Sequence, residues 1–202
     1  MIYCKESVEK SDFLNEAYRD LKIEYPKFFK MDALSKLAFL AAEVLLKESI
    51  LAKNAPNPNT AVILSNSASS IEVDTRFQAS MRDFPSPSLF VYTLPNVMIG
   101  EICIRHQITG ENMVLITESQ NSKSLSDIII AIDQEVEIQH YLIGYVDYTE
   151  EKQEALLAWI EKQEKFLTQK EQAEIYSFTI NQDYSKKSCK FAHFFFIKLI
   201  II

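Results

Sequence analysis

The sequence predicts a single α/β domain over residues 1–202, with a mostly parallel central sheet, helices on both faces and a C-terminal β-hairpin. Continuous apolar segments such as residues 141–146 are typical of parallel strands that are buried on both faces. Segments with helical spacing of apolar residues alternate with them, as in a layered α/β domain. A chain of 202 residues is also long enough for one domain with a proper core.

The first half of the chain contains two predicted helices and one predicted strand. The first helix covers residues 32–53, where Asp32 is the N-cap candidate and apolar residues recur at helical spacing. Residues 60–65 follow as a buried strand and residues 70–81 as a short helix. Residues 84–88 are expected to form a loop, because two closely spaced prolines deny a helix its hydrogen bonds.

The second half continues the alternation. The predicted helices share an apolar stripe, and they are residues 97–106, 124–137 and 150–172. The predicted strands are short and apolar, and they are residues 112–117, 141–146, 175–180 and 191–202, the last two forming the hairpin. The residues expected on the stripes are Val97, Gly100 and Ile104, then Leu125, Ile128, Ile129 and Ile132, then Leu156, Leu157 and Ile160.

Composition excludes several classes of function. The three glycines stand at positions 100, 110 and 144, so neither common Gly-rich phosphate loop can be written. The net charge of −7 gives no basic footprint, so we expect neither nucleic acid nor a membrane as a partner. Three widely spaced cysteines, and an N-terminus without the layout of a signal peptide, favour a cytoplasmic location.

No chemical site stands out from residue spacing. The positions of His, Cys, Asp and Glu predict no metal site, and no cofactor is expected. The three histidines, His106, His140 and His193, are expected to be structural. Residues 117–121 lack the glycines of a G-x-S-x-G nucleophile turn.

Two motifs carry a resemblance to a known family. The first is Lys30-Met31-Asp32, followed by an Ala/Leu-rich helix. The second lies within residues 84–122 and consists of Pro87, Asn96-x-x-x-Gly100, Thr109-Gly110-Glu111, an apolar strand and Thr117-Glu-Ser-Gln-Asn-Ser122. With these motifs the chain resembles the β-ketoacyl synthases over most of residues 27–202.

The resemblance implies a thiolase-like half-fold, because the family normally has two similar halves and this chain matches the first. Counting from Asn96, the acyl-accepting cysteine of the family falls on Ser119. The basic catalytic partners of the family come from its second half. A serine hydroxyl is a far weaker nucleophile than a thiolate, so condensation by this chain alone is not expected. Residues 64–70 stand where the family has a Gly-rich loop.

The candidate site residues follow from the resemblance. Ser119 is the candidate catalytic residue, as an acyl acceptor. The candidates for lining a cavity or an interface are Asn96, Gly100, Thr117 and Gln120. The structural alternative is that Ser119 or Ser122 caps the following helix, and Glu118 would oppose negative charge at a nucleophile.

The leading hypothesis is a pseudoenzyme, a ketosynthase-like subunit of a fatty-acid, polyketide or aryl-polyene assembly system. Chain-length-factor proteins also lack the cysteine and pair with a true ketosynthase, so the expected partner is a ketosynthase or a second copy. The alternatives are an acyltransferase-type enzyme that uses Ser119, or an acyl- or protein-binding module. An acyl carrier protein is a further possible partner, for which the basic cluster is Lys22, Lys27, Lys30 and Lys36. A solvated helix face is the alternative for that cluster.

Overall fold

The computed structural model describes residues 10–47, 49–51, 53, 55–118, 127–132, 137–162 and 195–201. Its strands are β1 (Thr60–Asn66), β2 (Asn112–Ile116), β3 (His140–Tyr148), β4 (Gln153–Lys162) and β5 (Phe195–Ile201). Its helices are α1 (Lys10–Asp20), the 3-10 helix η1 (Pro26–Lys30), α2 (Ala33–Leu46), α3 (Ile71–Ser80), α4 (Pro87–Tyr92) and α5 (Val97–His106). Residues 127–132 are also helical.

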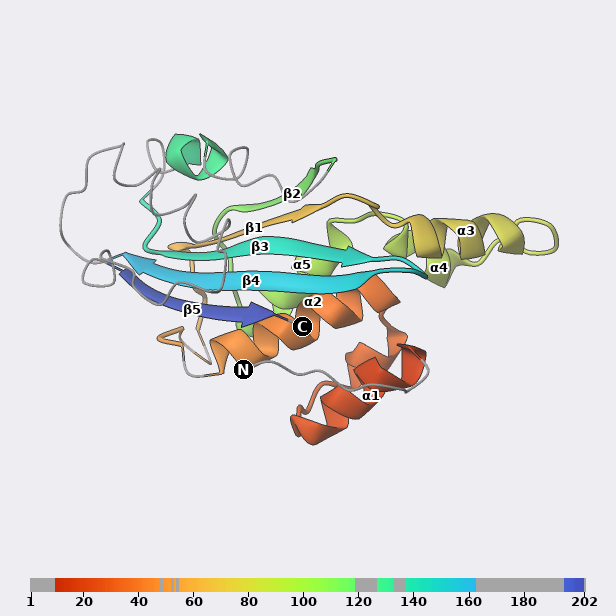
Figure 1. Cartoon of the computed structure of the whole chain (residues 1–202), viewed down its shortest axis with the longest axis horizontal. Coiled ribbons are helices and arrows are strands. Elements are labelled where there is room, and N and C mark those ends of the chain that lie inside the picture. The colour runs from red at the N-terminus through yellow and green to blue at the C-terminus, as the bar shows by residue number, and fades with distance from the viewer. Residues whose placement is uncertain are drawn as a thin grey trace.

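The five strands form one sheet in the order β2-β1-β3-β4-β5 (Figure 1). β1 is parallel to both β2 and β3, whereas β4 is antiparallel to β3 and to β5. Four of the five described strands therefore point the same way. Helices lie on both faces of the sheet (Figure 1). The predicted α/β class with a mostly parallel central sheet is confirmed.

The larger core lies between the sheet and the helices α2 and α5. α2 begins where sequence reasoning placed it, because the Asp32 carboxylate accepts a hydrogen bond from the Ser35 amide at 3.2 Å. The buried face of α2 packs with Val62 and Leu64 of β1 and with Trp159 of β4. The smaller core lies on the opposite face, where Ile129 of the segment 127–132 is fully buried, as predicted.

The predicted helix over residues 150–172 is wrong, because residues 153–162 form strand β4. Residues 155–160 are all buried, so both faces of the segment are covered, and β4 pairs with β3 along its whole length. A continuous apolar segment of six residues fits a strand with two covered faces better than a one-sided helix. The charged residues 150–152 form the turn between the two strands.

Smaller differences concern the helices. The loop predicted over residues 84–88 ends early, because α4 begins at Pro87, in the first turn, where proline removes no helix hydrogen bond. α5 has the predicted bounds, but it buries Met98, Ile99 and Ile102, whereas Ile104 is 61% exposed. α1 was not predicted. The predicted strand over residues 175–180, and with it the C-terminal hairpin, lies outside the described residues, and β5 pairs with β4.

Two glycines allow the backbone to approach closely, and the third does not. A Cβ atom on Gly110 would overlap the backbone carbonyls of Pro58 and Thr60. At Gly144 in β3, where φ is +156°, it would overlap the backbone of Leu156 and Leu157 in β4. At Gly100, none of the described atoms lies within 4 Å of that position. Close packing thus requires glycine at 110 and 144.

We expect Gly144→Ala to lower the free energy of unfolding by about 2–3 kcal/mol, because the added methyl group forces β3 and β4 apart. Gly100→Ala is the matched control and should raise it by roughly 0.5–1 kcal/mol, since alanine favours a helix interior. Urea unfolding of both variants measures the difference. Equal effects at the two positions would contradict the close approach at Gly144.

Candidate functional site

The parallel strands β1, β2 and β3 end at the same edge of the sheet. In open α/β sheets the loops beyond the carboxyl ends of such strands are where ligands usually bind. The strand ends are in register here, since Asn66 of β1 is opposite Ile116 of β2. The Thr117 amide extends this ladder by donating to the Asn66 carbonyl at 2.8 Å. This edge is therefore the candidate functional site.

A hydrogen-bonded triangle of side chains links β1 to β3 at this edge. The Ser67 hydroxyl donates to Oδ2 of Asp147 at 2.5 Å, and the Tyr145 hydroxyl donates to the same oxygen at 2.8 Å. The two hydroxyl oxygens lie 2.9 Å apart. Oδ1 of Asp147 accepts from the Ala68 amide at 3.0 Å. Tyr145 and Asp147 are buried, whereas Ser67 and Ala68 are half-buried, so one buried carboxylate binds three donors.

The loop after β1 is fixed by its own side chains. Asn66 donates from its side-chain amide to the Val146 carbonyl at 2.9 Å and accepts from the Ser69 amide. The Ser70 hydroxyl donates to the Thr93 carbonyl at 2.6 Å, which ties the start of α3 to the end of α4. Residues 66–70 thus use side-chain hydrogen bonds where the ketosynthase resemblance predicts a Gly-rich loop.

The electrostatics of the triangle favour an ionised carboxylate. Burial by itself would raise the pKa of Asp147, but hydrogen bonds from Ser67, Ala68 and Tyr145 stabilise the charged form and lower it. Burial raises the pKa of Tyr145, and the neighbouring Asp147 charge raises it further. A carboxylate with a lowered pKa and three donors is a poor proton acceptor. The triangle is therefore suited to holding β1 against β3, and it does not resemble a nucleophile with its base.

The structure places some of the predicted site residues at this edge. Thr117 is half-buried there, and strand alternation puts its side chain on the same face as Ser67. Ser119 and Gln120 lie outside the described residues. Asn96 is exposed at the start of α5, without a side-chain hydrogen bond to the helix, and Gly100 is one turn further on.

The histidines that the structure describes lie at the opposite edge of the sheet. His106 ends α5, where its Nε2 lies 3.2 Å from Glu43 of α2, and its carbonyl accepts from Asn57. His140 begins β3 and stacks on Trp159, with 5.5 Å between ring centroids. Along a strand it is roughly 20 Å from Asp147. Both contacts are of the structural kind that the sequence predicts.

Glu43 holds α2 and α5 together near His106. Its carboxylate accepts from Arg105 at 2.8 and 3.3 Å. Burial alone would raise the pKa of Glu43, but the hydrogen bonds from His106 and Arg105 lower it. This ion pair joins α2 to α5, and sequence reasoning missed it.

The basic cluster predicted for a carrier protein is divided in the structure. Lys27 pairs with the buried Glu101 at 2.9 Å, whereas Lys36 is half-buried beside Asn15. The described residues contain no group of three His, Cys, Asp or Glu side chains placed to bind a metal ion. None of the helices in the described part of the chain has the length and hydrophobicity of a membrane span.

Sequence reasoning missed Ser67, Tyr145 and Asp147. One signal could have found them, since a carboxylate directly follows the apolar segment 141–146 and a run of small polar residues follows β1. Parallel strands bring those two segments to one edge. Their pairing spans about eighty residues of sequence, so no local pattern reports it.

We expect Asp147→Asn to lower the free energy of unfolding at pH 7 by about 2 kcal/mol, because hydrogen bonds to a charged acceptor are lost. A lowered native pKa stabilises the fold above the unfolded value of about 3.9, and this contribution is lost as the pH falls through the native pKa. The difference between wild type and variant should therefore narrow below about pH 4. Urea unfolding at pH 7 and pH 3 measures it, with the exposed Asp83→Asn as control. A difference that is independent of pH would contradict the ionised triangle.

No protein-family model matches the sequence, and no curated protein matches it. Among solved structures, one described as the ishigamide ketosynthase/chain length factor matches 59% of this chain, with 24% identity and a TM-score of 0.51. The match covers 35% of that chain, so this chain spans about a third of its length.

A second solved structure is a ketosynthase in complex with its chain length factor from Xenorhabdus doucetiae. The match covers 79% of this chain and 76% of that chain, with 12% identity and a TM-score of 0.47. The first match is sufficient for the fold. The chain has the thiolase-like fold of a ketosynthase/chain length factor, as its resemblance to the β-ketoacyl synthases predicts.

Proposed function

We propose that this chain is a non-catalytic ketosynthase-like subunit that pairs with a ketosynthase. Its carboxyl-edge polar groups bind one another, and the described histidines lie at the other edge, which supports a role without chemistry of its own. The solved structure with this fold is named a ketosynthase/chain length factor. Pairing with a ketosynthase is the corresponding role for this chain.

The observation that carries the proposal is a projecting apolar arm, formed by α3, α4 and the residues between and after them. The arm extends beyond the end of the sheet (Figure 1). Contact between the rings of Phe77 and Phe90, at 5.4 Å, joins its two helices. Large apolar side chains that are at least half exposed gather on it, and they are Ile71, Met81, Phe84, Phe90, Val91 and Leu94.

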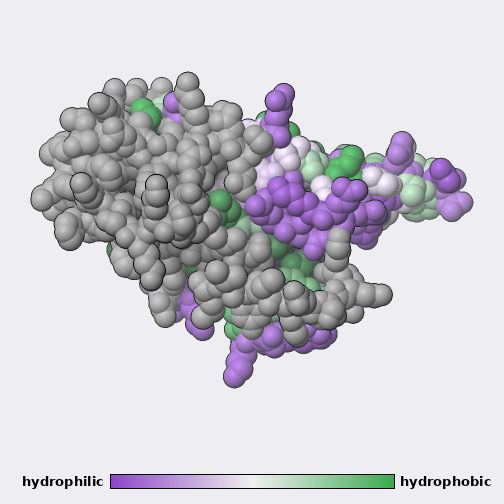
Figure 2. Space-filling view, viewed as in Figure 1, coloured by the Kyte–Doolittle hydropathy of each residue, from purple (hydrophilic) through white to green (hydrophobic). Residues whose placement is uncertain are grey.

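Exposure of this kind is costly for an isolated subunit. Phe84 is 81% exposed, and burying such a side chain is worth about 1.5–3 kcal/mol. Figure 2 shows hydrophobic and hydrophilic residues interleaved over the arm. An apolar surface with polar residues around it is typical of a protein–protein contact. The arm is therefore the surface at which we place the ketosynthase partner.

The finer identity of the system follows from the same proposal. The expected setting is a fatty-acid, polyketide or aryl-polyene assembly system, and the expected compartment is the cytoplasm. An acyl carrier protein is a further partner that such a system would offer this chain. If the chain is non-catalytic, Ser119 would serve as a cap of the following helix, which is the structural alternative to an acyl acceptor.

The test is co-purification of the full chain with a ketosynthase of the same organism. We expect a stable complex on size exclusion, and a dissociation constant raised at least tenfold by Phe84→Ser combined with Leu94→Ser. Ile50→Ser is the matched control, because Ile50 is 63% exposed and lies outside the arm. It should leave the affinity unchanged.

Two results would overturn the proposal. One is a monodisperse monomer that binds none of the ketosynthases offered to it. The other is a complex whose affinity responds to Ile50→Ser as strongly as to the double variant, because the arm would then carry no special contact. Self-association through the arm, with no affinity for a ketosynthase, would make the partner a second copy.

A further inference from the structure

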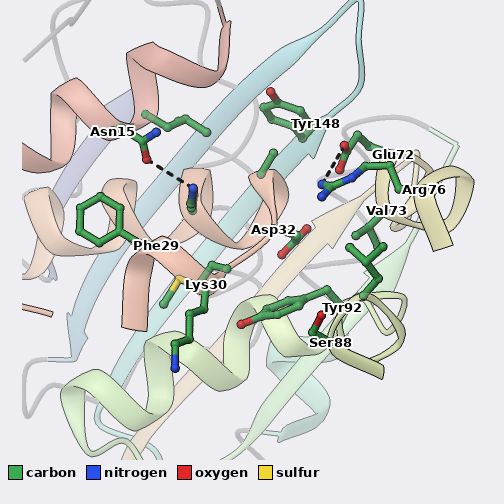
Figure 3. Close-up of a pocket in the computed structure, with 15 residues that line it drawn as sticks. Asn15, Phe29, Lys30, Asp32, Glu72, Val73, Arg76, Ser88, Tyr92 and Tyr148 are labelled. Atoms are coloured by element: carbon green, nitrogen blue, oxygen red, sulfur yellow. Dashed lines mark hydrogen bonds and ion pairs between the residues drawn. The ribbon is translucent and has the colours of Figure 1, made fainter. Parts of the chain in front are cut away.

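We draw no further inference here: the strongest candidate, the pocket of about 400 Å³ lined by residues of α1, η1, α2, α3, α4 and the end of β3 (Figure 3), favours a ligand of neither charge, because Asp32 shares its lining with cationic side chains and Arg76 is already paired with Glu72.

Discussion

The carboxylate of Asp147 is the contact on which the candidate site and the projecting arm of this protein depend. It binds the Ser67 hydroxyl and the Ala68 amide just after β1, and so fixes the direction in which the chain leaves the sheet. Ser70, two residues further, ties the start of α3 to the end of α4. The projecting arm begins at this point. Loss of the carboxylate would therefore disturb the arm as well as the carboxyl edge of the sheet.

Side-chain hydrogen bonds in the loop after β1 help to explain how a sequence so poor in glycine builds this fold. A Gly-rich loop would let the backbone turn freely beside a reacting group, whereas residues 66–70 are held by side-chain hydrogen bonds. Glycine is present where two backbones must meet, at Gly110 and Gly144. The scarcity of glycine agrees with a scaffold whose polar groups serve structure. It adds to the case for a subunit that acts by its shape.

Sequence reasoning predicted the parts of the fold that follow from local pattern. β1, β3 and α5 lie where apolar spacing placed them, and Asp32 caps α2 as expected. α2 ends at Leu46, however, and not at residue 53 as predicted. β4 was mistaken for a helix, because its charged flanks imitate a solvated face and its covered faces depend on partners distant in sequence. The triangle of Ser67, Tyr145 and Asp147 was missed for the same reason. Thr117 lies at the carboxyl edge, and the roles of Thr117 and Ser119 stay predictions.

The central proposal is that this chain contributes shape and not acyl chemistry. Intact mass spectrometry tests it most directly, after incubation of the full chain, alone and with its ketosynthase partner, with an acyl-coenzyme A and with an acylated carrier protein. The account predicts that this chain keeps its unmodified mass while the ketosynthase takes up the acyl group. An acyl adduct on this chain that is lost in Ser119→Ala would contradict it.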